Sequence, residues 1–227
     1  MASGLFITGT DTGIGKTYVS TLLINYFIAR GERVIGMKPI ASGAQSIKGQ
    51  LRNDDAVTLM QASNVSADYA LVNPYCFAPP IAPHIAAQQT QTTISLEHIM
   101  HCYSALQAQS DRVIVEGVGG WLVPINEQQT AADIALQLQL PVIMVVGIKL
   151  GCLNHALLTE QAIQAQGGHL LGWIANQIDP DMPGYVENIS TLETRLNVPL
   201  LARIPFAKSA SSESFITVQN QFNRFKF

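Results

Sequence analysis

Hydrophobic positions along the chain fall into short apolar runs separated by longer stretches in which apolar and polar residues alternate with helical spacing. Near-continuous apolar runs of a few residues are typical of strands that are buried on both faces of a parallel sheet. Such runs occupy residues 5–8, 33–37, 113–115, 142–146 and 170–175. The pattern therefore predicts a sheet assembled mostly from parallel strands.

The stretches between these runs predict helices. In residues 17–30 an apolar face is formed by side chains at the i, i+3, i+4, i+7 and i+8 positions, which are Val19, Leu22, Leu23, Tyr26 and Phe27. Gly31 is a natural end for that helix, and a second helix is expected over residues 154–166. Strands that alternate with helices predict an α/β fold with a doubly wound, mostly parallel sheet, here as a single domain over residues 1–227.

A phosphate-binding loop is predicted between the first strand and the first helix, in the segment GTDTGIGKT at residues 9–17. Gly9 lies one residue earlier than the strict P-loop pattern requires. Successive backbone N–H groups at a helix start still form a nest for anions. We expect Lys16 to contact the β- and γ-phosphates of a nucleotide and Thr17 to offer its hydroxyl to Mg²⁺.

Several polar residues follow predicted strands at the same sheet edge as this loop, where ligands of α/β proteins bind. They are Lys38, Glu116, Asn176 and the segment 149–151. Glu116 occupies the place of a metal-binding carboxylate in P-loop folds, and Mg²⁺ prefers oxygen ligands. Lys38 is either a solvated lysine at a strand end or a cation that neutralises a transferring phosphoryl group.

Other features favour ordinary structural interpretations. Asp54 is expected to cap a helix, and the pair His98 and His101 lacks a third metal ligand, which predicts an exposed polar face. The proline-dense segment 77–84 predicts a stiff connection that is neither helix nor strand, and nothing in its composition indicates a substrate pocket. The segment NQID at 176–179 differs from the guanine-binding NKxD box at Gln177, so adenine is the favoured base.

Composition narrows the classes of protein that remain. The 227 residues are 48% hydrophobic and 13% charged, with 13 Lys and Arg against 16 Asp and Glu, which argues against a nucleic-acid partner. The longest apolar run, at 140–148, is shorter than the ~18 residues of a membrane span. The three cysteines form no C-x-x-C pair, and no basic leader precedes the first strand. We expect a cytoplasmic protein with no membrane partner.

Motifs along nearly the whole chain, from residue 9 to about residue 206, resemble the dethiobiotin synthetase family. They are GTDT at 9–12 with GKT at 15–17, KPIASG at 38–43, RND at 52–54, PH at 83–84, VEGVGGW at 115–121, GCLNH at 151–155 and GWIAN at 172–176. The resemblance implies a homodimeric enzyme of biotin biosynthesis that makes dethiobiotin from 7,8-diaminononanoate (7,8-diaminopelargonate), CO₂ and ATP. A carbamate and a carbamoyl-phosphate anhydride would be the intermediates, and ADP and phosphate the other products.

The resemblance also assigns roles to individual residues. Lys16 and Lys38 would be catalytic, flanking the carbamate and the γ-phosphate. Thr17, Asp55 and Glu116 would hold Mg²⁺. The substrate-binding positions would be Thr12 and Ser42, together with Gly151, Cys152 and Asn154 of the partner subunit around the distal carboxylate. The nucleotide-binding positions would be Gly13, Ile14, Gly15, Lys16, Thr17, Tyr18, Asp55, Glu116, Asn176, Gln177, Pro205, Phe206 and Ala207.

Some positions depart from the family pattern. Gly13 stands where relatives often carry an acidic residue, Gln177 replaces a common Asp, and Glu213 is the nearest match for a nucleotide-contacting Glu.

Two alternative functions are found in other proteins that share the P-loop. An amidase-type ligase usually adds a glutaminase domain, for which this chain has no room. A partition-type switch ATPase carries an extra lysine where Thr10 and Asp11 stand here.

Overall fold

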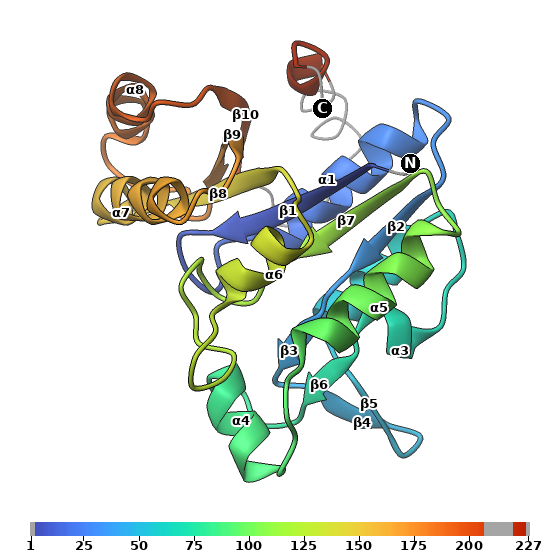
Figure 1. The fold of residues 1–227 in the computed structure, drawn as a ribbon. Helices are drawn as coiled ribbons and strands as arrows, with labels where there is room; N and C mark the ends of the chain where they lie inside the picture. The colour runs from blue at the N-terminus through green and yellow to red at the C-terminus, as the bar shows by residue number, and fades with distance from the viewer. Residues whose placement is uncertain (1–2, 207–219, 226–227) are drawn as a thin grey trace.

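A six-stranded sheet forms the centre of the computed structural model, which describes residues 3–206 and 220–225 (Figure 1). The strand order is β10-β9-β8-β1-β7-β2, and all neighbouring strands are parallel. The strands are β1 (Ser3–Gly9), β2 (Val34–Met37), β7 (Arg112–Glu116), β8 (Val142–Ile148), β9 (Leu170–Gln177) and β10 (Leu200–Ile204). From β1 the chain crosses to the β2 edge, returns through β7 and continues with β8 on the other side of β1. The predicted doubly wound sheet is therefore confirmed.

Side chains alternate between two hydrophobic cores, one on each face of the sheet. Leu5 and Ile7 of β1 pack into the core beneath helix α1 (Lys16–Ile28), whereas Phe6 packs into the core on the opposite face. Helices α5 (Leu96–Gln107), α6 (Ala131–Gln137), α7 (Cys152–Ala165) and α8 (Tyr185–Arg195) cover that second face (Figure 1). Because both faces are covered, the strands need apolar residues at every position, which explains the continuous runs in the sequence.

Glycines start the two helices that follow β1 and β8. Gly15 precedes α1 with φ 85°, and Gly151 precedes α7 with φ 93°, a left-handed conformation that other residues adopt only at a cost. The predicted helices began at residues 17 and 154, so both start slightly earlier in the structure. Each helix N-terminus is thereby placed at the carboxyl edge of the sheet.

The chain between β2 and β7 contains smaller elements that the hydrophobic pattern did not predict. They are β3 (Ile40–Ser42), the hairpin β4 (Gln45–Ile47) and β5 (Gln50–Arg52), α2 (Asp54–Ala62), α3 (Tyr69–Val72), β6 (Tyr75–Phe77) and α4 (Pro83–Gln89). The prediction that residues 77–84 form neither helix nor strand is wrong at both ends, because Phe77 ends β6 and Pro83 starts α4. Proline is well tolerated in the first turn of a helix, where its missing N–H has no intrahelical partner to lose.

Two further sequence expectations concern capping and metal binding. The cap of α2 is Asn53, whose side chain accepts hydrogen bonds from the backbone of Asp55 and Ala56, so the assignment of Asp54 as the cap is wrong. His98 and His101 lie exposed on α5, as expected. Within residues 3–206 and 220–225, no helix is long and apolar enough to cross a membrane.

Candidate active site

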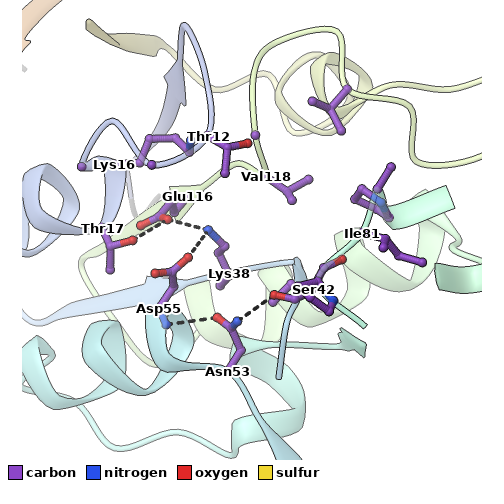
Figure 2. A pocket seen from close by; sticks show the side chains of 18 residues that line it. Thr12, Lys16, Thr17, Lys38, Ser42, Asn53, Asp55, Ile81, Glu116 and Val118 are labelled. Atoms are coloured by element: carbon purple, nitrogen blue, oxygen red, sulfur yellow. Dashed lines mark hydrogen bonds and ion pairs between the residues drawn. The ribbon is translucent and has the colours of Figure 1, made fainter. Parts of the chain in front are cut away.

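A cavity of about 680 Å³ opens at the carboxyl ends of β1, β2 and β7 (Figure 2). Its walls come from the phosphate-binding loop, β3, the start of α2, the segment before α4 and the loop after β7. The lining residues are Thr12, Gly13, Gly15, Lys16, Thr17, Lys38, Ala41, Ser42, Asn53, Asp55, Pro80, Ile81, Ala82, Pro83, Glu116, Val118, Gly119 and Val123. Side chains that lie far apart in the sequence thus share one cavity.

Lys16 is buried at the start of α1, and its Nζ donates a hydrogen bond to the backbone oxygen of Asp11 at 2.8 Å. Burial, together with the positive charge of Lys38, lowers the pKa of Lys16 to about 8. An anion that enters the cavity would favour the charged form of Lys16. The loop therefore presents a cation that responds to a phosphate group.

Lys38 is buried at the end of β2 and bridges two carboxylates. Its Nζ donates to Glu116 Oε1 at 2.5 Å, to Asp55 Oδ2 at 2.9 Å and to the backbone oxygen of Gly117 at 3.3 Å. Burial by itself would lower the pKa of Lys38, but the charges of Glu116 and Asp55 outweigh it and raise that pKa. Lys38 is thus a fixed cation inside the cavity and not a solvated lysine at a strand end.

The groups expected to hold Mg²⁺ lie around this lysine. Thr17 Oγ1 donates to Glu116 Oε1 at 2.9 Å, and burial of Asp55, which would raise its pKa, is outweighed by the charge of Lys38, which lowers it. Glu116 Oε2 is buried and has no hydrogen-bond partner among the described residues. Two carboxylates and a hydroxyl, with one carboxylate oxygen unpartnered, fit a hard cation that keeps waters and nucleotide oxygens as its other ligands.

Asn53 connects Asp55, on one side of the cavity, with Ser42 on the other. Its side-chain oxygen accepts from the backbone N–H of Asp55 at 3.1 Å, and its Nδ2 donates to the backbone oxygen of Ser42 at 3.2 Å (Figure 2). Ser42 Oγ is buried and has no hydrogen-bond partner in the described part of the chain. A buried hydroxyl without a partner is costly, so a ligand that bonds to it gains affinity.

The remaining wall of the cavity is apolar. Ala41, Ile81, Val118 and Val123 line it together with prolines of the segment 80–83. Composition alone indicated no pocket at that segment, and this expectation is wrong. A cavity with charged groups at one end and an apolar wall at the other suits a ligand that has both a polar reacting group and a hydrocarbon chain.

Residues expected at the base of the nucleotide do not line this cavity. Asn176 is buried, and its Nδ2 donates to the backbone oxygen of Ile14 at 2.8 Å beneath the phosphate-binding loop. Gln177 Oε1 accepts from the backbone N–H of Phe206 at 3.2 Å. Tyr18 lies in the first turn of α1, and Pro205 follows β10. Ala207 and Glu213 lie outside the described residues.

The residues expected to cap the substrate carboxylate also lie away from the cavity. Gly151, Cys152 and Asn154 form the start of α7, and none of them is among the residues that line it. Gly151 and Asn154 are exposed, whereas Cys152 is buried with its Sγ 3.9 Å from Asn188 Oδ1. One chain by itself therefore does not bring these three residues to Lys38.

Comparison with known sequences decides the family. A family model described as an AAA domain matches residues 3–214. The ATP-dependent dethiobiotin synthetase BioD of Xanthomonas axonopodis pv. citri (strain 306) is 47% identical over 207 residues, which are 91% of this chain and 92% of that protein. The enzyme of the same name from Xylella fastidiosa (strain M12) is 45% identical, over 89% and 90% of the two chains. The chain belongs to the dethiobiotin synthetase family.

Two solved structures with the same fold come from other classes of P-loop protein. Cobyrinic acid a,c-diamide synthase from Mycobacterium smegmatis, with bound ATP analogue and magnesium, has a TM-score of 0.62 at 15% identity and covers 97% of this chain and 92% of its own. MinD of Pyrococcus horikoshii, complexed with Mg-ADP, has a TM-score of 0.57 at 15% identity and covers 99% and 97%. At such low identity these structures confirm the P-loop fold and nothing finer.

Even with the family known, the sequence did not predict several residues that line the cavity. These residues lie in or near family motifs, but none is of a type that by itself indicates a catalytic or metal-binding role. They are Ala41, Asn53, Val118, Gly119 and Val123. The only available signal was position, since each lies within a few residues of a predicted site residue. Within the 80–83 segment only Pro83 belongs to a family motif, PH at 83–84, and residues 80–82 carry no such signal.

Proposed function

We propose that the chain catalyses the ATP-dependent carboxylation and ring closure of 7,8-diaminononanoate to dethiobiotin, with release of ADP and phosphate. The observation that carries the proposal is the single cavity in which the phosphate-binding loop, the buried Lys38 and an apolar wall meet. It offers room for the end of a triphosphate beside an aliphatic diamine. The dethiobiotin synthetase relatives match over nearly their full length, which supports the same reaction here.

The proposed reaction starts when one neutral amine of the substrate attacks CO₂ and releases a proton to solvent, which gives a carbamate. A carbamate oxygen attacks the γ-phosphorus of ATP, the bond to the ADP oxygen breaks, and a carbamoyl phosphate results. The second amine then attacks the carbonyl carbon, phosphate leaves with the bonding electrons, and the ring nitrogen loses a proton. The enzyme's task is to orient the two reacting groups and to neutralise charge.

Lys16 and Lys38 supply positive charge on two sides of the transferring phosphoryl group in this proposal. Because the carboxylates around Lys38 raise its pKa, Lys38 is protonated at neutral pH and acts as a charge stabiliser rather than as a base. Ser42 Oγ and Thr12 hydrogen-bond the substrate, and the apolar wall around Ile81 and Val118 excludes water from its hydrocarbon chain. Asn176 and Gln177 are proposed to lie near the adenine.

Magnesium would be held by Thr17, Asp55 and Glu116, and when bound it neutralises charge on the β- and γ-phosphates. The unpartnered Glu116 Oε2 supports this assignment. Within this proposal the protein is a homodimer in which Gly151, Cys152 and Asn154 of each subunit cap the carboxylate of the substrate bound to the other. Exposure of Gly151 and Asn154, away from their own cavity, agrees with such a use. A single domain and a cytoplasmic location stay predictions.

The direct test is a mass-spectrometric assay for dethiobiotin with purified protein, MgATP, bicarbonate and 7,8-diaminononanoate, in which ADP is followed alongside. We expect dethiobiotin and ADP in equal amounts and only when the diamine is present. ADP without dethiobiotin would contradict the proposal and favour a switch ATPase or an amidase-type ligase. A control with Lys38→Gln protein separates product made by this enzyme from a contaminant.

A further inference from the structure

The phosphate-binding loop carries a negative charge of its own at Asp11, close to the proposed phosphate site. Asp11 Oδ1 accepts from the backbone N–H of Thr12 at 2.7 Å, and its backbone oxygen accepts from Lys16 Nζ at 2.8 Å. A carboxylate at the mouth of an anion-binding nest opposes the binding of a polyanion, because like charges raise its energy. The loop therefore needs a means of neutralising this charge.

Lys149 provides that neutralisation from the neighbouring loop. Its Nζ lies 2.9 Å from Asp11 Oδ2. Lys149 follows β8, which pairs directly with β1, and the backbone N–H of Thr10 donates to the oxygen of Val145 at 3.1 Å. The two loops thus leave adjacent strands at one edge of the sheet and are tied together at their origin.

The ion pair also places the Asp11 carboxylate. Thr12 and Lys16 line the cavity, whereas Asp11 does not. The hydrogen bond from Lys149 is the main reason that the pKa of Asp11 is lowered, so Asp11 is charged at neutral pH. The negative charge of Asp11 also acts on Lys16, where it offsets part of the lowering of the pKa that burial causes. A carboxylate released from Lys149 could therefore turn to Lys16 and compete with phosphate.

We propose that Lys149 is a positioning residue of the nucleotide site, which holds the Asp11 carboxylate outside the cavity and leaves Lys16 available to the nucleotide phosphates. The inference rests on the proposed function, because it presupposes that a nucleotide binds at this loop. Lys149 itself does not touch the nucleotide. Its effect is exerted through Asp11.

The test measures MgADP binding by isothermal titration calorimetry for wild type, Lys149→Met, Asp11→Asn and the double variant. Asparagine keeps the acceptor for the Thr12 N–H and removes only the charge. Both side chains of the pair are about 40% exposed, so water screens their charges and limits the effect. We expect Lys149→Met to weaken MgADP binding by about fivefold. In the double variant no carboxylate is left to compete, so affinity should return to within about twofold of wild type.

The double variant separates positioning from ordinary structural support. If the ion pair merely stabilised the loop, the double variant would bind MgADP as weakly as Lys149→Met, and that result would overturn the inference. Unchanged binding by Lys149→Met would overturn it as well. Failure of the wild-type protein to bind MgADP would overturn the proposed function itself. In steady-state assays we expect Lys149→Met to raise the KM for ATP while kcat and the KM for the diamine stay the same.

Arg33→Met is the matched control. Arg33 forms another exposed ion pair, with Asp111 at 3.0 Å, next to the N-terminal ends of β2 and β7 and hence at the sheet edge opposite the cavity. Loss of that pair removes a surface interaction of the same kind without changing charge near the nucleotide. We expect Arg33→Met to bind MgADP as wild type does.

Discussion

At the scale of single residues, the cavity is organised around cations whose surroundings differ. Lys38 is enclosed by two carboxylates that keep it charged, whereas Lys16 has a backbone oxygen as its hydrogen-bond partner and a pKa lowered to about 8 by burial. The same residue type thus serves as a permanent charge in one place and as a charge that depends on pH in the other. Each behaviour leads to a separate experiment.

Removal of the Lys38 charge should abolish product formation but not nucleotide binding. In Lys38→Gln the γ-phosphoryl group loses one of its two neutralising cations, so we expect kcat to fall by at least about 100-fold. MgADP affinity should stay close to that of wild type, because the phosphate-binding loop is intact. Both quantities follow from the dethiobiotin assay and from calorimetry.

The same variant tests the carboxylate pair that Lys38 bridges. Without the ammonium group, the buried Glu116 loses the counter-charge that is hydrogen-bonded to it, and the free energy of unfolding should fall by about 3 kcal/mol in EDTA. Added Mg²⁺ should restore part of that loss in the variant and much less in wild type. An equal response of both proteins to Mg²⁺ in a thermal melt would contradict the assignment of Glu116 as a metal ligand.

Lys16 predicts that nucleotide affinity depends on pH. Its pKa is about 8 in the free protein, and a bound phosphate raises it, so MgADP binding takes up a proton above that pH. Affinity should therefore fall as pH rises from about 8 toward 10, and stay level between pH 6.5 and 7.5 as far as Lys16 is concerned. Calorimetry across this range measures the effect. Lys16→Arg, which keeps its charge, should not show the fall.

At the scale of elements, the turn from β1 into α1 depends on how closely the end of β9 approaches it. A Cβ atom on Gly15 would overlap Asn176 Nδ2, which is bonded to the Ile14 backbone oxygen, and Gly15 has φ 85°. Gly13 in the same loop has φ 72°, but a Cβ there would meet no atom within 4 Å. Two glycines of one loop thus have different reasons to be glycine.

Alanine at these two positions separates backbone strain from steric overlap. In Gly13→Ala the only cost is the left-handed backbone conformation, which is unfavourable by about 1–2 kcal/mol. MgADP binding should therefore weaken only modestly. Gly15→Ala must also displace Asn176 and the loop, and we expect MgADP binding to weaken by more than about 30-fold. Calorimetry on both variants makes the comparison. Equal losses would show that Asn176 does not brace the loop.

At the scale of the whole molecule, a C-terminal piece closes the core beneath α1. Phe222 is fully buried, and its ring lies 5.4 Å from that of Tyr26, while Gln221 bonds to the backbone N–H and oxygen of Arg203 on β10. Residues 221 and 222 therefore join α1 to β10. The stability of the sheet edge at β10 should depend on them.

Phe222→Ala should destabilise the entire protein. Truncation of a fully buried aromatic side chain costs about 3–5 kcal/mol, which a denaturant titration can resolve. Phe225→Ala is the matched control, because Phe225 is only partly buried against the same core, and it should cost less than half as much. A loss for Phe222→Ala no larger than that for Phe225→Ala would contradict the anchoring role.

The sequence by itself determined the central strands, α1 and α7, the phosphate-binding loop and the family. All of these depend on residues that are close together in the chain, such as apolar runs and the Gly15-Lys16-Thr17 turn. β10 was missed because an exposed Arg203 interrupts its apolar run. Prediction of α2 was incomplete for another reason: two adjacent polar residues can each act as a cap, and only the backbone geometry selects Asn53.

Only the tertiary structure decided what surrounds each functional side chain. Lys38 could not be told from a solvated lysine until β7 and α2 placed Glu116 and Asp55 against it, 78 and 17 residues away. The tertiary structure also places the proline segment in the wall of the cavity and brings Lys149 into contact with Asp11. The charge state and solvation of a side chain depend on its neighbours in space. The sequence reveals those neighbours only where they are also close together along the chain.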